Sequence, residues 1–169
     1  TLREHQPYAR WGASGAQMID VNGQLFEAAP GGANDPAIPT LAGPDDQSAT
    51  VLAMYRDLNP LVAPLHDRMA VLELETRGDW RAWLTGRSSP PGSGTAPDAV
   101  IELGAGTAAE LAARLRTFVA TVPMVAARHQ RGVADIETAD LRHVNGYALR
   151  LRGVDTTGDP AAANPVTKQ

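Results

Sequence analysis

The stretch A-D-L-R-H-V-N-G-Y-A-L-R-L-R, from Ala139 to Arg152, decides the fold expected for the end of this chain. Its odd-numbered positions are mostly apolar or aromatic, whereas most of its charged residues stand at even-numbered positions. A period of two is typical of a strand with one buried face and one solvated face. Only residues 153–169 follow, so we expect this strand to be the last structured element.

The Asn145-Gly146 pair within the stretch is also a strong hairpin signal. A two-residue turn there would set Leu141 opposite Arg150, which mixes apolar and charged side chains on each face. One long strand with a bulge near the glycine keeps the two faces separate, and we favour it. At a sheet edge, its unpaired N–H and C=O groups would form a template for another chain.

Upstream of this stretch, turn chemistry predicts two hairpins, which join residues 18–20 to 24–27 and residues 71–75 to 80–84. Residues 8–11 and 99–103 are expected to be further strands. Breaker residues predict loops over residues 28–44 and 86–98.

Two amphipathic helices are expected. The first begins near Ser48 and carries an apolar stripe, and the second begins at Thr107, where T-x-x-E is a capping box. Pro60 and Pro123 should each end or kink a helix. The order of elements predicts an α+β domain over residues 12–152, with a mostly antiparallel sheet, two helices packed on one face, a long C-terminal edge strand, and a disordered tail over residues 153–169.

Composition limits the function classes. The chain has 169 residues, a net charge of −4 and no cysteine. This charge disfavours nucleic acid as a partner, and the lack of cysteine excludes disulfides and thiolate sites. No apolar run reaches the ~18 residues that a membrane helix needs, although a chain that opens on Thr1 is expected to be a fragment of a longer protein.

No catalytic or metal-binding pattern is present, so we expect no catalytic residue, no metal and no cofactor. The four histidines, His5, His66, His129 and His143, stand in different predicted elements and lack ligand spacing. Arg77-Gly78-Asp79 matches a tripeptide found in adhesion ligands, but Gly-Asp is also ordinary turn chemistry.

Gly104-Ala105-Gly106 follows a predicted strand, opens a helix and fits a loose G-x-G-x-x-A dinucleotide pattern. A nucleotide-binding enzyme fragment is therefore an alternative function. We expect no parallel strand–helix–strand continuation after this turn, and a tight strand-to-helix turn explains the same glycines.

Addition of a partner strand to the C-terminal edge strand is the more specific hypothesis. An added strand would gain affinity from main-chain hydrogen bonds and specificity from alternate side chains, here His143, Tyr147, Leu149 and Leu151. The alternative is that these side chains fill the core beneath the helices.

Eight segments stand in a suggestive order: P-Y-A-R-W at 7–11, D-V-N-G-Q-L-F-E at 20–27, I-P-T-L-A-G-P at 38–44, the helix at 51–58, D-W-R-A-W-L-T at 79–85, I-E-L-G-A-G at 101–106, R-L-R-T-F-V at 114–119 and A-D-L-R-H-V-N-G-Y-A-L at 139–149. In this order and spacing they resemble the periplasmic β domain of the FtsQ/DivIB family of bacterial cell-division proteins.

The resemblance implies a non-enzymatic divisome scaffold of the inner membrane, with one membrane helix and a POTRA domain outside this fragment. Residues 1–11 would be the end of the POTRA domain and the junction. It also implies that the last strand binds FtsB, within the FtsB–FtsL pair, by strand addition. Other divisome proteins are further candidate partners.

Carried over by position, the implied partner-binding set is Arg142, His143, Asn145, Gly146, Tyr147 and Leu151, with Arg77 nearby. The two arginines would bind carboxylates of the partner. The chain departs from the family at His143, where relatives often have Tyr, and at Leu151, where an aromatic residue such as Trp occurs.

Overall fold

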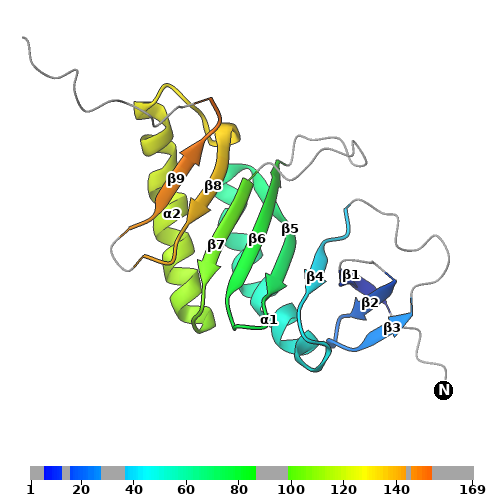
Figure 1. Cartoon of the computed structure of the whole chain (residues 1–169). Helices are drawn as coiled ribbons and strands as arrows, with labels where there is room; N and C mark the ends of the chain where they lie inside the picture. The colour runs from blue at the N-terminus through cyan, green and yellow to red at the C-terminus, as the bar shows by residue number, and fades with distance from the viewer. Residues whose placement is uncertain (1–5, 13–15, 28–36, 87–98, 144–145, 154–169) are drawn as a thin grey trace, which may run out of the picture.

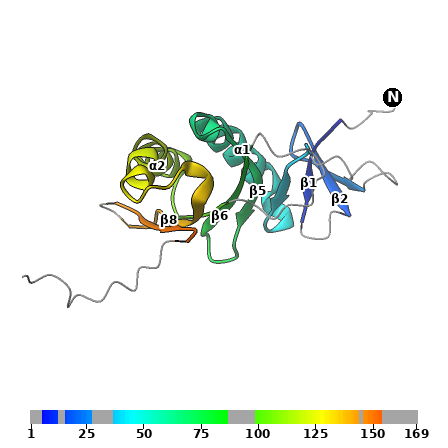
Figure 2. The same ribbon diagram turned by 90° about the horizontal axis from the view of Figure 1, so that it is seen from above.

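The computed structural model describes residues 6–12, 16–27, 37–86, 99–143 and 146–153. These residues form a nine-stranded sheet in the order β3-β2-β1-β4-β5-β6-β7-β8-β9. Two α-helices, α1 and α2, lie on one face of the sheet, and the opposite face, on which neither of them lies, is called the open face below (Figures 1 and 2). The strands are β1 (Pro7–Trp11), β2 (Gln17–Asp20), β3 (Leu25–Glu27), β4 (Thr40–Ala42), β5 (Asp67–Leu74), β6 (Trp80–Gly86), β7 (Ala99–Gly104), β8 (Ile136–Asp140) and β9 (Ala148–Leu151), and the helices are α1 (Ser48–Leu58) and α2 (Ala108–Arg128).

The sheet is mixed. Among the described strands, five neighbouring pairs are antiparallel, and three, β1–β4, β4–β5 and β7–β8, are parallel. The α+β class, with a mostly antiparallel sheet and two helices on one face, is therefore confirmed. Residues 7–11, expected at a junction, form β1, which pairs with β2 and β4 in the same sheet.

The core lies between the sheet and the helices. Alternate residues of the central strands, such as Leu72 and Ile101, are fully buried against apolar stripes that include Leu58 on α1 and Phe118 on α2. A capping box at Thr107 begins α2 as predicted. Pro123 does not end this helix, which continues to Arg128.

Strand β4 was not predicted. Residues 40–44 were expected to belong to a loop, but Thr40–Ala42 pairs in parallel with both β1 and β5. Its three residues contain one fully buried side chain, Leu41, and breaker residues flank it on both sides. The strand forms because neighbouring strands on both sides supply its hydrogen bonds, and a local pattern does not show this long-range pairing.

Both predicted hairpins are present as β2–β3 and β5–β6. The loop expected over residues 86–98 and the tail expected over residues 153–169 lie almost wholly outside the described residues.

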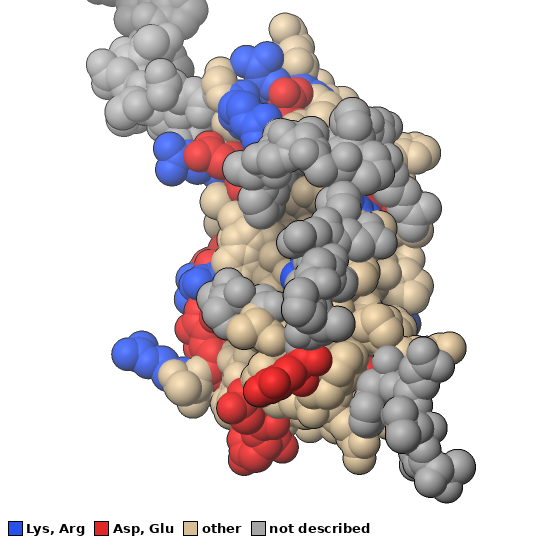
Figure 3. Space-filling model, turned by 90° about the vertical axis from the view of Figure 1, so that its right-hand side faces the viewer, with Lys and Arg blue, Asp and Glu red and all other residues tan. Residues whose placement is uncertain are grey.

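In Figure 3, acidic side chains gather at the lower end of the surface, and the basic side chains in view lie mainly along the upper and left margins.

Candidate partner-binding edge

The quoted C-terminal stretch forms a hairpin, so the prediction of one long strand is wrong. Strand β8 ends at Asp140, residues 141–147 connect, and β9 returns antiparallel to β8 as the outermost strand of the sheet. The register places Ala139 opposite Leu149 and Asp140 opposite Ala148. The C-terminal strand is therefore at the edge, as expected, but it is short.

A two-residue turn was rejected because it would mix apolar and charged side chains on each face of the hairpin. The observed hairpin has a wider loop, which avoids this mixing. In the observed register, Ala139 faces Leu149 and Thr138 faces Arg150, so apolar and polar side chains stay on separate faces. From Thr138 to Asp140, paired residues are both odd-numbered or both even-numbered, and the register shifts only beyond them, at the pair Ile136–Leu151. The period of two therefore continues across the loop and imitates a single strand.

The main-chain groups of β9 divide between β8 and the free edge. The N–H of Leu141 donates to Glu102 O on β7, and the N–H of Arg152 donates to Asp135 O, just before β8. Main-chain N–H and C=O groups alternate in direction along a strand, so those of Asp140 point to β9 and those of its pair Ala148 point to β8. By the same alternation, the N–H and C=O groups of Leu149 and Leu151 point to the free edge.

The side chains of these two leucines point to the helix side. Leu151 is 6% exposed and belongs to the core, and Leu149 is half-buried against it. A partner strand would meet the main chain of these residues, whereas Ala148 and Arg150 present exposed side chains on the open face. Arg150 Nε lies 3.2 Å from Glu137 Oε2 across the hairpin.

Tyr147 attaches the connecting loop to α2. Its hydroxyl lies 2.8 Å from Thr121 Oγ1, and its ring packs edge-to-face on Phe118 with the centroids 5.1 Å apart. A groove of about 220 Å³ lies beside it, between α2 and the loop. The groove is lined by Ala113, Arg114, Thr117, Leu141, His143, Gly146 and Tyr147.

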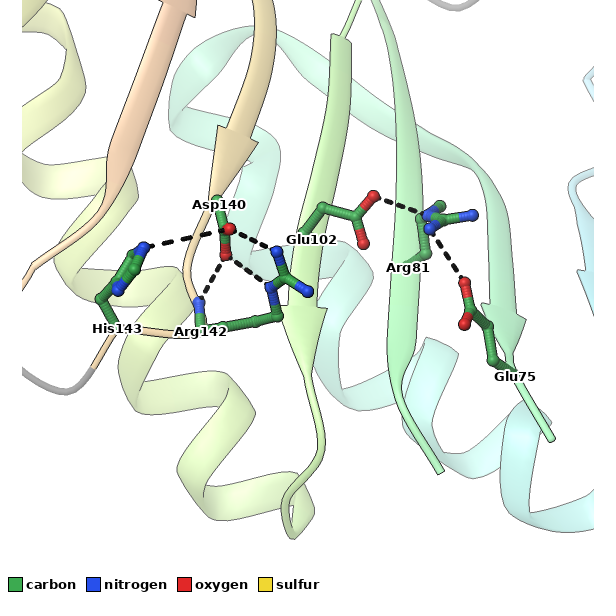
Figure 4. Close-up of polar contacts among 6 residues, drawn as sticks. All are labelled: Glu75, Arg81, Glu102, Asp140, Arg142 and His143. Carbon is green, nitrogen blue, oxygen red and sulfur yellow. Dashed lines mark hydrogen bonds and ion pairs between the residues drawn. The ribbon is translucent and has the colours of Figure 1, made fainter. Parts of the chain in front are cut away.

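Arg142 and His143 are exposed residues on the loop after β8, and both approach Asp140 (Figure 4). Arg142 Nε and Nη2 lie 2.9 and 2.6 Å from the two carboxylate oxygens of Asp140, whereas His143 Nε2 lies 4.0 Å from Oδ2. Hydrogen bonds from the Arg142 side chain are the main reason that the pKa of Asp140 falls to about 2. The carboxylate in turn raises the pKa of Arg142.

A second charged group lies beside this one on the open face. Arg81 on β6 bridges Glu102 on β7 and Glu75 after β5, at 2.8 and 2.9 Å (Figure 4). The bond to Glu102 raises the pKa of Arg81. This end of the open face therefore carries fixed charges of both signs.

Arg77 is exposed in the β5–β6 turn, at the same end of the sheet as the start of β9. Gly78 donates its N–H to Glu75 O and has φ of 89°, so turn geometry accounts for the Arg77-Gly78-Asp79 motif. Asn145 lies outside the described residues. The structure therefore brings His143, Gly146 and Tyr147 together at one groove, sets Arg142 beside Asp140 next to His143, and places Arg77 in a separate turn.

The prediction for the chain after the Gly104–Gly106 turn is wrong. Strand β8 is parallel to β7 and follows α2, so the parallel strand–helix–strand unit that we did not expect is present. The chain's own side chains occupy the turn, however. Glu110 accepts the N–H of Thr107 at 2.8 Å, and Arg114 donates to Leu103 O and Ala105 O. A carboxylate already occupies this helix N-terminus, which does not favour the nucleotide alternative.

No cluster of three or more His, Cys, Asp or Glu side chains suited to a metal occurs among the described residues. Within those same ranges, the helices are too short or too polar to cross a membrane.

Comparison with known proteins supports the resemblance drawn from the sequence. Residues 9–142 match the family model "Cell division protein FtsQ/DivIB, C-terminal". Relatives named cell division protein FtsQ include those of Thiomonas arsenitoxydans, 35% identical over 97% of this chain, and Burkholderia pseudomallei, 34% identical over 91%. The FtsQ of Escherichia coli is 28% identical over 88% of the chain.

The chain belongs to the FtsQ/DivIB family. It spans about half the length of these FtsQ relatives, covering 56%, 55% and 48% of them in the same order. The match to the FtsQ/DivIB model runs through β8 to Arg142 and so includes the Asp140–Arg142 contact, whereas β9 lies beyond the matched residues.

Sequence reasoning missed two residues at this edge. Asp140 was seen only as a polar position of a strand, and Gly104 only as part of a possible nucleotide turn. The D-x-R spacing of Asp140 and Arg142 was the available signal, because side chains two residues apart on an extended chain point to the same side.

Proposed function

We propose that this chain is a divisome interaction domain that binds FtsB, within the FtsB–FtsL pair, by adding a strand of the partner to β9. One observation carries the proposal: β9 is the outermost strand, and its alternation directs the main-chain groups of Leu149 and Leu151 to the free edge. An added strand would satisfy these groups, which is the usual source of affinity in strand addition.

Side chains at the β8–β9 loop would supply specificity. Arg142 and His143 are exposed there, and the groove beside Tyr147 offers space for a partner side chain. A carboxylate of the partner would bind Arg142, and a second would bind Arg77 in the β5–β6 turn. Asn145 belongs to the same proposed set.

The proposed role is that of a non-enzymatic scaffold and regulator, which links septum formation to peptidoglycan synthesis. Membership of the FtsQ/DivIB family supports a place in the division machinery. The protein would act in the periplasm, anchored in the inner membrane by a helix outside this fragment. Other divisome proteins are further candidate partners.

The test is calorimetric titration of the FtsB periplasmic segment, with and without FtsL, into the chain and into Leu149→Pro. Proline removes the N–H that faces the free edge, so we expect binding to weaken by about tenfold or more. Leu149→Ala is the matched control, because it loses the same side-chain packing but keeps the N–H.

Circular dichroism would confirm that both variants are folded. Equal weakening by proline and alanine would place the partner away from the free edge. A lack of binding by the unmodified chain would refute the proposal itself.

A further inference from the structure

Arg142 is an exposed residue with a fixed side chain. Its Nε and Nη2 donate to Oδ1 and Oδ2 of Asp140 at 2.9 and 2.6 Å, and its backbone N–H donates to Oδ1 at 3.0 Å. An exposed arginine normally samples many rotamers, and binding a partner then costs the entropy of ordering it. Here a neighbour on the same chain has already ordered the guanidinium.

The stem of Arg142 is held as well as its head. A Cβ added at Gly104 would lie 2.7 Å from Arg142 Cγ and 3.5 Å from its Cβ, so the arginine stem rests against bare backbone at the end of β7. Figure 4 shows the side chain extending from the end of β8 towards β7. Both ends of the side chain are therefore fixed on the open face.

One edge of the guanidinium remains available. Asp140 uses the edge formed by Nε and Nη2, and among the described residues no hydrogen bond to Nη1 is found. The Arg142 side chain is 56% exposed. A guanidinium presents five N–H donors in a rigid fork, so the edge formed by Nη1 and Nη2 can still bind a carboxylate in bidentate geometry.

Arg142 lies on a path from the free edge to the β5–β6 turn. The starts of β6 and β9 and the ends of β5, β7 and β8 share one end of the sheet, and the charge of Asp79 in the β5–β6 turn acts on Arg142. A partner that continues past β9 at this end would meet the oriented guanidinium before it reached Arg77.

We propose that Asp140 is a positioning residue, which holds Arg142 ready to bind a carboxylate on the segment that flanks the added strand. This inference rests on the proposed function. Asp140 itself touches no partner. It increases affinity because the ordering of the arginine is completed during folding rather than during binding.

The first measurement needs no partner. In nuclear magnetic resonance spectra, the Nη2–H signals of Arg142 should be resolved and slow to exchange in the unmodified chain, and they should lose both properties in Asp140→Asn, which replaces the acceptor Oδ2 by an NH2 group. Asparagine keeps Oδ1 as an acceptor for the backbone N–H and Nε of Arg142, so the loop should stay folded. An unchanged signal would overturn the positioning role.

The second measurement is a double-mutant cycle for binding of the FtsB segment. We expect Asp140→Asn to weaken binding roughly three- to tenfold, and to have no further effect in an Arg142→Ala background. Glu137→Gln removes one negative charge from a neighbouring exposed ion pair on the same hairpin, so it corrects for long-range charge effects.

Each outcome decides something. Tighter binding by Asp140→Asn would show that Asp140 competes with the partner, and additive effects would show that it does not act through Arg142; either result overturns the inference. Loss of all binding in the unmodified chain would instead refute the proposed function, while the resonance measurement would still report on the Asp140–Arg142 contact.

Discussion

Gly104 has a backbone that L side chains rarely adopt, with φ of 76°, and it lies against Arg142. The residue that looked like part of a nucleotide-binding turn thus makes room for an arginine stem. Its partner could not be found from local sequence, because Arg142 is far along the chain and reaches Gly104 only through the parallel pairing of β7 with β8.

Replacing Gly104 by alanine should lower the free energy of unfolding by about 1–3 kcal/mol, from backbone strain and from the clash with Arg142 Cγ. Urea unfolding would measure this loss. Gly78→Ala is the control, because Gly78 has a similar φ of 89° but open space around it. The excess loss at Gly104 should vanish in an Arg142→Ala background, and equal losses at the two glycines would contradict the proposed contact.

At the scale of elements, α2 was the best-predicted part of the chain. Its stripe of buried residues and its capping box are local features, and the structure shows both. The same capping box occupies the turn after β7: Glu110 accepts the N–H of Thr107, and the side chain of Thr107 accepts the N–H of Glu110. The backbone N–H and the hydroxyl of Thr107 both donate to the Glu110 carboxylate, and these two bonds lower the pKa of Glu110.

Thr107→Ala should therefore destabilise the protein by about 0.5–2 kcal/mol in urea unfolding, because one N–H of the first turn loses its acceptor. Thr107→Ser keeps the hydroxyl and should retain most of the stability. If serine cost as much as alanine, the methyl group of the threonine, rather than its capping bond, would account for the loss.

The β8–β9 hairpin shows where element prediction fails. A strand pattern reports which face a residue occupies, but it does not report chain reversal when the loop preserves the alternation. The inward positions of Leu149 and Leu151 were thus predicted as alternate side chains of an edge strand, yet the choice between core and partner needed the register. Arg142 and His143, which were named as partner-facing residues, are exposed in the structure, whereas the proposed role of Asp140 depends on a contact outside any regular strand.

At the scale of the whole molecule, carboxylates on the open face form ion pairs near the ends of neighbouring strands. Asp140 at the end of β8 lies beside Glu102 on β7 and Ala148 on β9 in the sheet register. Arg142 and His143 face it from the loop, and Glu102 is itself paired with Arg81. Hydrogen bonds from the Arg142 side chain are the main reason that the pKa of Asp140 falls from its ordinary 3.8 to about 2.

A carboxylate whose pKa is lower in the folded protein than in the unfolded chain stabilises the fold when it is ionised. Its contribution is complete above the ordinary value of 3.8 and disappears as the pH falls to about 2. Asp140→Asn should therefore be less stable than the unmodified chain at pH 6, and the difference should shrink between pH 4 and pH 2.5. Urea unfolding across this range would measure it.

In an Arg142→Ala background the main cause of the shift in the pKa of Asp140 is gone, so Asp140→Asn should have little effect on stability at any pH. A difference that stayed constant from pH 6 to pH 2.5 would show that the Asp140–Arg142 pair does not link protonation of the open face to the stability of the whole sheet.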